Sequence, residues 1–282
     1  LTTKPTPRAY ERQEGRVLFH AGTRLEALLR DALCDPLHDA LGNTLHGGLL
    51  SGGEELVWPT RCVRCNAPGS LLCEECRTHL AWIGQRWACP VCGAPFGWLT
   101  CTECTGDWEL RTTTCALVFA GTAARMATVL KDEHELRLAP VLASAMATSL
   151  DEASAWAAPD GNARFDADRV DALCFVPATQ AACLRRGFDH MELVTRALAA
   201  ELALPVADVL ARDPARDQRT LDRRGRAANL EGGVHVVDDV RGARLLLLDD
   251  IVTTGASMRA CARALISSGA AEVGGCALAR VW

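Results

Sequence analysis

Two adjacent acids followed by hydroxyl residues and a glycine form the segment of this chain with the clearest chemical meaning. Asp249 and Asp250 stand just before the run Thr253-Thr254-Gly255-Ala256-Ser257. Paired carboxylates suit a ribose diol, either directly or through Mg2+. Hydroxyls and free backbone N–H groups at the start of a helix suit a phosphate. The segment therefore predicts a site for a phosphorylated sugar.

The residues on either side predict the elements that would position this site. Four leucines at residues 245–248 run directly into the two acids, which is typical of a buried parallel strand with apolar residues on both faces. Residues 257–266 have the composition of a helix, and Gly269 stands where its C-terminus is expected. Ligands of open parallel sheets bind at the carboxyl ends of the strands, where these acids lie. The alternative is a generic strand-turn-helix with solvated acids.

Eight of the 14 cysteines form four C-x-x-C pairs within an internal repeat. One copy contains Cys62, Cys65, Cys73 and Cys76, and the other contains Cys89, Cys92, Cys101 and Cys104. Four thiolates satisfy tetrahedral zinc, and a site filled entirely by protein ligands is structural rather than catalytic. We therefore predict two structural Zn2+ ions, one for each copy, although interleaved pairing also fits the spacing. Redox-active dithiols are the alternative, but such motifs do not normally occur four times in one chain.

Tryptophan is concentrated in and beside the cysteine segment. Five of the seven tryptophans lie there: Trp58, Trp82, Trp87, Trp98 and Trp108. They could stack nucleobases. Because a segment this small needs apolar residues, we expect them to form its core instead. Its basic and acidic residues are balanced, so a nucleic-acid role is only weakly indicated.

Composition and length exclude several classes of protein. A net charge of −5 over 282 residues argues against non-specific coating of nucleic acid. No apolar run approaches the ~20 residues of a membrane span, and the start of the chain lacks the apolar region of a signal peptide. These features predict a cytoplasmic protein without membrane insertion. Four scattered cysteines are expected in the core as small apolar residues: Cys115, Cys174, Cys261 and Cys276.

Three regions follow from these patterns. Residues 1–57 form an N-terminal extension, partly helical over residues 24–40, with a glycine-rich loop at residues 42–55. Residues 58–108 form the cysteine module. Residues 111–282 alternate strand-like and helix-like stretches, the pattern of a parallel α/β domain. The role of the first region and the oligomeric state stay open.

The order of strand, acid pair and phosphate turn resembles the phosphoribosyl-pyrophosphate (PRPP) signature of type I phosphoribosyltransferases. The resemblance implies a parallel sheet flanked by helices, here preceded by a double zinc ribbon. It implies that magnesium-bound PRPP places its 5′-phosphate on the turn from Thr253 to Ser257 and its ribose hydroxyls on Asp249 and Asp250. Ribose 5-phosphate would pass to a nitrogen nucleophile, whose identity is open, with release of pyrophosphate.

A narrower resemblance, over about residues 59–281, is to the ComF family of competence-associated phosphoribosyltransferase-like proteins. Arg186-Gly187-Phe188-Asp189-His190 is similar to that family's Arg-Gly-Phe-Asn-Gln stretch, and Val176-Pro177 is similar to the start of its pyrophosphate loop. Gln218 and Arg226 have the spacing of its flexible loop, and Lys131 ends a similar first strand-helix unit. The chain departs from the family at Asp189 and His190, after Pro177, and after Lys131. These departures concern the pyrophosphate and acceptor contacts.

Each remaining candidate residue has a structural alternative. Arg185 and Arg186 are expected just before a helix N-terminus, where positive charge gains nothing from the helix dipole, so a role in binding pyrophosphate beside Pro177 is favoured. Asp189 is expected to cap that helix, with Glu192 completing a capping box. Lys131 is expected at a solvent-facing helix end. The arginine-rich stretch around Gln218 and Arg226 is either a solvated face or a lid over pyrophosphate.

Two other functions compete with a phosphoribosyltransferase. The first is a non-catalytic adaptor that binds single-stranded DNA in natural transformation or DNA repair, with competence or helicase proteins as partners; the ComF resemblance implies it. The second is a zinc-stabilised scaffold with an empty pocket. The presence of Asp249 and Asp250 favours ligand binding for both the phosphoribosyltransferase and the adaptor.

Overall fold

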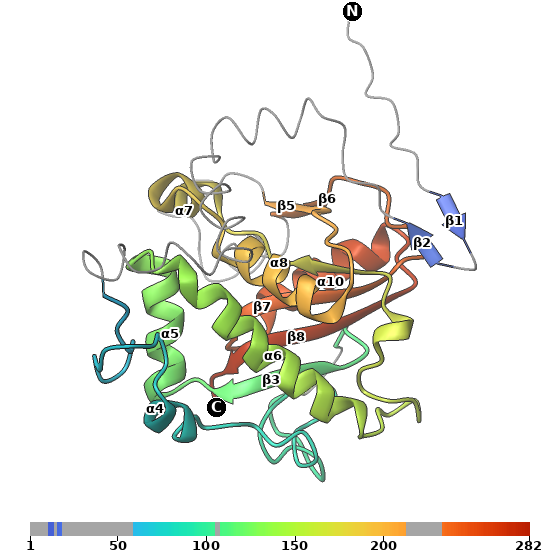
Figure 1. Cartoon of the computed structure of the whole chain (residues 1–282). Helices are drawn as coiled ribbons and strands as arrows, with labels where there is room; N and C mark the ends of the chain where they lie inside the picture. Colours follow the sequence, from blue (N-terminus) through green and yellow to red (C-terminus); the bar gives the residue numbers. More distant parts are fainter. Residues whose placement is uncertain (1–10, 14–15, 19–58, 105–107, 213–232) are drawn as a thin grey trace, which may run out of the picture.

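The computed structural model describes residues 11–13, 16–18, 59–104, 108–212 and 233–282 (Figure 1). Several predictions concern residues outside these ranges. They are the helix at residues 24–40, the glycine-rich loop at residues 42–55, Trp58, Gln218 and Arg226.

A four-stranded parallel sheet forms the centre of the fold (Figure 1). Its order is β3 (Thr113–Val118), β8 (Glu272–Arg280), β7 (Arg244–Val252) and β4 (Ala172–Phe175). All three pairings between neighbouring strands are parallel. The predicted parallel α/β architecture is thereby confirmed, with the leucine strand at residues 245–248 inside β7.

Helices cover both faces of this sheet, which explains the unbroken apolar run of β7. Leu246 and Leu248 join one core cluster with α5, α6 and α8. Leu245 and Leu247 join a second cluster with α10. All four leucines are at most 3% exposed, as a strand buried on both faces requires. The helix bounds are α5 (Gly121–Asp132), α6 (Ala139–Ser154), α8 (His190–Leu202) and α10 (Ala256–Ser267).

Shorter elements connect this framework. The helical ones are α4 (Glu74–Thr78), η1 (Leu136–Leu138), η2 (Ala167–Arg169) and α7 (Gln180–Arg186). The strands β1 (Glu11–Gln13) and β2 (Arg16–Leu18) pair with each other, as do β5 (Leu210–Arg212) and β6 (Val234–Val236), both antiparallel. The β5–β6 pair brackets residues 213–232. Among the described residues, no helix is long and apolar enough to cross a membrane.

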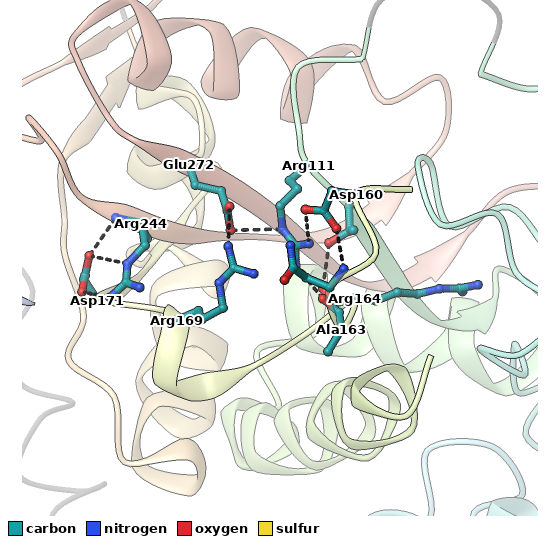
Figure 2. Close-up of polar contacts among 10 residues, drawn as sticks. Arg111, Asp160, Ala163, Arg164, Arg169, Asp171, Arg244 and Glu272 are labelled. Atoms are coloured by element: carbon teal, nitrogen blue, oxygen red, sulfur yellow. Dashed lines mark hydrogen bonds and ion pairs between the residues drawn. The ribbon is translucent and has the colours of Figure 1, made fainter. Parts of the chain in front are cut away.

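Ion pairs tie together the amino ends of the strands, at the end of β7 away from the acid pair. Figure 2 shows Glu272, at the start of β8, between Arg111 and Arg169. The nitrogen–oxygen distances of these two ion pairs are 3.0 and 3.3 Å. Arg244, at the start of β7, pairs with Asp171 at 2.9 Å. Because each of these arginines has an acidic partner, this edge of the sheet is a structural network.

The cysteine segment packs against both faces of the α/β core. Leu71, Leu72 and Leu80 contact the cluster that contains α5 and α6, whereas Ile83 and Ala88 belong to the cluster that contains α10. The backbone N–H of Ile83 donates to the carbonyl of Ala116 on β3 at 2.9 Å. The segment is therefore anchored along the edge strand of the sheet.

The expectation that tryptophans form the core of the cysteine segment is wrong for three of them. Trp82, Trp87 and Trp98 are 44%, 48% and 52% exposed. The buried cluster of the second copy consists instead of Cys89, Cys92 and Ala94. A bound metal can supply the folding energy that a small segment otherwise draws from an apolar core. By contrast, the predicted burial of Cys115, Cys174, Cys261 and Cys276 is confirmed, each being 0% exposed.

Candidate functional site

The acid pair lies at the carboxyl end of β7 and is almost fully enclosed. Asp249 is 9% exposed and Asp250 is 7% exposed. The backbone N–H of Asp250 donates to Asp249 Oδ1 at 2.9 Å. Asp250 Oδ2 contacts Lys131 Nζ and lies 3.3 Å from His190 Nε2. The prediction that Lys131 faces solvent is wrong, because α5 packs with its last turn beside β7 and directs the ammonium group to the acid.

The two neighbouring carboxyls have opposite electrostatic environments. Burial and the adjacent charge of Asp250 raise the pKa of Asp249 well above its usual value. Burial alone would raise the pKa of Asp250 too, but His190 and Lys131 outweigh it and hold that pKa below its usual value. The pKa values of two close acids commonly move apart in this way when a cation compensates the charge of only one of them. Asp250 is therefore the carboxylate, and Asp249 is the member of the pair that retains a proton more readily.

A tight turn joins β7 to α10 directly after the acids. Gly255 adopts φ 75° at the N-cap of α10, a left-handed conformation that favours glycine. Thr254 Oγ1 accepts a hydrogen bond from the backbone N–H of Ala256 at 3.4 Å. The first turn of this 12-residue helix contains no acid. Its free N–H groups and positive dipole end are therefore available to an anion.

A cavity of about 340 Å3 opens over the acids and the turn. Six of the predicted site residues line it: Asp249, Asp250, Thr253, Ser257, Pro177 and Arg186. Thr254, Gly255 and Ala256 belong to the same turn but do not line the cavity, and Arg185 is exposed outside it. The lining residues outside the predicted set include three with basic side chains: Lys131, His190 and Arg212. The structure thus brings together the acids, most of the phosphate turn and one of the two arginines.

The two arginines differ from the prediction in their local structure. Arg185 and Arg186 are the last residues of helix α7, which ends at Gly187 in the left-handed conformation. Both arginines precede the N-terminus of α8, as predicted, but they also end α7, where the dipole favours positive charge, so the helix dipole no longer favours a ligand there. Arg186 Nη2 nevertheless donates to Asp132 at 3.4 Å, and its buried Nε has no hydrogen-bond partner in the described part of the chain. That nitrogen is a donor available to a ligand in the cavity.

Asp189 joins the helix α8 to the loop after β4. Its Oδ1 accepts from the backbone N–H of Met191 at 2.9 Å, which confirms the predicted cap. Its Oδ2 accepts from the backbone N–H of Ala178 at 2.7 Å and so fixes the loop beside Pro177. Glu192 accepts a hydrogen bond from Arg196 Nη2 at 2.7 Å. Because this arginine, one turn further along α8, binds the carboxylate, the structure differs from the predicted capping box.

His190 follows the cap and is 7% exposed, directed toward Asp250. In the sequence, His190 stood out only by its place beside the cap and within the stretch that resembles the ComF family.

The eight cysteines of the repeat form two groups of four thiols in sequential order. One contains Cys62, Cys65, Cys73 and Cys76, and the other Cys89, Cys92, Cys101 and Cys104. In each group all sulfur atoms lie within 4.8 Å of one another. Three sulfur–sulfur distances within the groups are 3.5 to 3.6 Å, close to the ~3.8 Å between ligands of a tetrahedral zinc with ~2.3 Å bonds. The groups therefore fit the metal that the spacing predicted, without interleaving.

Charge near the second group also suits a metal thiolate site, which carries two negative charges when four thiolates hold one Zn2+. A hydrogen bond with Cys92 lowers the pKa of Cys89 to about 5. The buried guanidinium of Arg164 donates to the carbonyls of Gln85 and Ala88 and interacts with Cys89. Glu103 donates its backbone N–H to Cys101 Sγ at 3.4 Å. The Cys92 thiol and the Arg164 guanidinium thus stabilise the thiolate of Cys89.

Residues 182–281 match the family model described as phosphoribosyl transferase domain. The matched range begins in α7 and contains the acid pair, the turn and α10. Among curated proteins, no match was found.

Several solved structures are similar to part of this chain. The allosteric regulatory enzyme of purine biosynthesis is 17% identical, with a TM-score of 0.31, over 51% of this chain and 25% of its own. A mutant hypoxanthine phosphoribosyltransferase from Trypanosoma cruzi is 16% identical, with a TM-score of 0.29, over 52% and 68%. The Trypanosoma cruzi enzyme in complex with IMP is 12% identical, with a TM-score of 0.30, over 52% and 67%. The likeness spans a quarter of the first protein and about two thirds of the others. Residues 182–281 are therefore similar to a phosphoribosyl transferase domain, and the parallel sheet flanked by helices resembles the type I phosphoribosyltransferase fold.

Proposed function

We propose that this protein binds magnesium-complexed PRPP and transfers its ribose 5-phosphate to a nitrogen nucleophile, releasing pyrophosphate. One observation carries the proposal: a buried acid pair and a phosphate-type turn share one cavity, inside the segment that matches the phosphoribosyl transferase domain. The carboxylates at the carboxyl end of the strand can accept hydrogen bonds from sugar hydroxyls, and the N–H groups at the helix N-terminus can donate to a phosphate.

Each part of the substrate has a counterpart in the cavity wall. The 5′-phosphate would lie on the turn formed by residues 253–257, and the ribose hydroxyls would donate to Asp249 and Asp250. Pyrophosphate would leave toward the loop at Pro177, where the backbone N–H groups near α7 and the free Nε of Arg186 can bind it. The negative charge of Asp250 would stabilise positive charge that develops on the ribose in the transition state. Mg2+, when present, would neutralise pyrophosphate charge as the bond to C1′ breaks.

The cysteine groups have a structural role in this proposal. We assign one Zn2+ to each group, with the region of residues 58–108 as a double zinc ribbon and residues 111–282 as the transferase domain. All four positions of each metal would be occupied by protein, so neither ion would have a position for substrate.

Calorimetry with PRPP and Mg2+ on the zinc-loaded full chain tests the proposal. The double variant Asp249→Asn with Asp250→Asn should weaken binding about a hundredfold or more, because two hydrogen bonds to charged groups are lost. A matched control is Asp151→Asn with Asp168→Asn, which changes the net charge equally at two exposed positions outside the cavity. A folded wild type that does not bind PRPP, or a double variant that binds like the control, would refute the proposal.

The second candidate, a single-stranded-DNA-binding adaptor, is favoured by one observation on the cysteine module. Phe96 and Trp98 are 72% and 52% exposed, and Arg86 lies 4.7 Å from the centre of the Trp87 ring. Exposed aromatic rings beside arginine can stack bases. Membership of the ComF family and competence or helicase partners remain predictions that belong to this candidate. Binding to single-stranded DNA that falls steeply with salt and is lost in Trp98→Ala would favour it, and absent or salt-insensitive binding would exclude it.

A further inference from the structure

Three contacts link the second cysteine group, or residues beside it, to the phosphate turn and the start of α10. This group is Cys89, Cys92, Cys101 and Cys104, and the turn comprises residues 253–257. The first group has no such contacts among the described residues. The leucines within and just after it pack on the other core cluster, which contains α5 and α6, and Thr60 nearby accepts from Arg137 at 3.2 Å. Among the described residues, the second cysteine group is therefore linked to the wall of the cavity, and the first group is not.

The first contact is made by Trp108, four residues after Cys104. The Trp108 ring packs both on the second cysteine group and on the α10 side of the core. It lies so close to Gly255 that a Cβ at this position would be 2.3 Å from Trp108 Cη2. Trp108 Nε1 donates to Thr113 Oγ1 at 3.1 Å, which fixes the plane of the ring. The ring is thus the surface against which the backbone of the turn lies.

The second contact holds the first turns of α10. Glu109 accepts from Arg259 Nε at 2.9 Å and also contacts Arg263 Nη1. The Arg259 guanidinium lies 5.5 Å from the centre of the Trp108 ring. Burial opposes ionisation of Glu109, but the two arginines outweigh it and lower its pKa. The residues next to the cysteine group therefore clamp the helix whose N-terminus faces the phosphate.

The third contact holds the other end of the turn. Arg280, at the end of β8, is 1% exposed. Its guanidinium donates to the carbonyls of Val252 and Thr253, where the chain leaves β7. Its Nη2 lies 3.7 Å from Glu103 Oε2, inside the Cys101–Cys104 pair. Among the described residues, Glu103 is the only acid that forms an ion pair with this buried cation.

We infer that the second cysteine group, when it holds its metal, positions the phosphate turn through Trp108 and Arg280, so that phosphate affinity depends on this metal site and not on the first. The inference rests on the proposed function of the turn as the 5′-phosphate site. A helix N-terminus binds an anion well only when its N–H groups converge, and small displacements of a supporting ring or carbonyl contact change that convergence. Trp108 and Arg280 are positioning residues, since neither lines the cavity.

Two ligands separate positioning of the turn from general damage to the fold. Ribose 5-phosphate engages the turn, whereas magnesium pyrophosphate engages the opposite wall near Pro177 and Arg186. In calorimetry on the zinc-loaded full chain, Trp108→Ala should weaken ribose 5-phosphate binding about tenfold, the effect of losing one hydrogen bond to a charged group. Pyrophosphate affinity should stay unchanged. Trp108→Phe keeps a ring against Gly255 and should restore most of the affinity, and Trp87→Ala, at a half-exposed ring of the same module, should bind like the wild type.

A comparison of cysteine variants tests the metal dependence without relying on Trp108. Cys101→Ser and Cys73→Ser each remove one thiolate, from the second and first group respectively, and zinc analysis should show loss of one ion in each. Ribose 5-phosphate affinity should fall only in Cys101→Ser. Equal affinities in the two cysteine variants, or equal loss of both ligands in Trp108→Ala, would overturn the inference. A wild type that binds neither ligand would instead refute the proposed function, and the inference with it.

Discussion

Gly255→Ala perturbs the phosphate turn at the point where two constraints coincide. Gly255 has φ 75°, a conformation that L-residues with a Cβ rarely adopt. The new methyl group would also meet three atoms of the Trp108 ring, at 2.3, 3.0 and 3.2 Å. The ring cannot simply rotate away, because its Nε1 is bonded to Thr113 and Arg259 lies over its face.

The expected loss of stability follows from these two constraints. A left-handed conformation costs a residue with a Cβ about 1–2 kcal/mol. Inserting a methyl group into a packed contact costs about 1–3 kcal/mol more. Gly255→Ala should therefore lower the free energy of unfolding by about 2–5 kcal/mol. Only the second part depends on Trp108.

Urea unfolding of the zinc-loaded chain, followed by circular dichroism, measures this loss. A double-mutant cycle with Trp108→Ala separates the two parts, because removing the ring leaves only the conformational cost at Gly255. The coupling free energy between the two positions should be about 1–3 kcal/mol. Additive effects within about 0.5 kcal/mol, or a single variant as stable as the wild type, would refute the contact between the ring and the turn.

Three further predictions concern buried groups. Asp249 has a raised pKa in the fold, so its ionisation should reduce stability increasingly as pH rises above ~4. In urea unfolding, Asp249→Asn should therefore be more stable than the wild type at pH ~8 but not at pH ~4. Lys131→Met should lower the free energy of unfolding by about 2 kcal/mol, because Asp250 loses a cation. Arg125→Met, which breaks an exposed ion pair on the same helix, should lower it by under about 1 kcal/mol. Equal losses in the two variants would contradict the burial of the Lys131–Asp250 pair. Cys276→Ser buries a hydroxyl in an apolar site and should cost about 1–3 kcal/mol, a loss measurable as a lower urea midpoint; an unchanged midpoint would contradict the packing around this thiol.

Local order along the chain was enough to predict much of this protein. The unbroken leucines of β7 specified a strand buried on both faces, and the acids and glycine after them specified its carboxyl end and the turn to α10. The repeat of C-x-x-C pairs predicted two groups of four thiols, and the structure decided between sequential and interleaved pairing. These features are local because strand burial, helix starts and short cysteine turns depend on residues close together in the chain.

Contacts between distant segments could be decided only by the tertiary structure. Lys131 and His190 meet Asp250 because α5 and α8 pack on the same face of the sheet, and nothing in the spacing of these residues encodes that. Arg186 differs from Arg185 because the end of α7 directs only one of them to the cavity. Trp108 supports Gly255, which lies 147 positions later in the sequence, because the cysteine module lies along β3 and reaches the α10 face. Such pairs depend on how whole elements pack, which is a property of the complete fold rather than of any short segment.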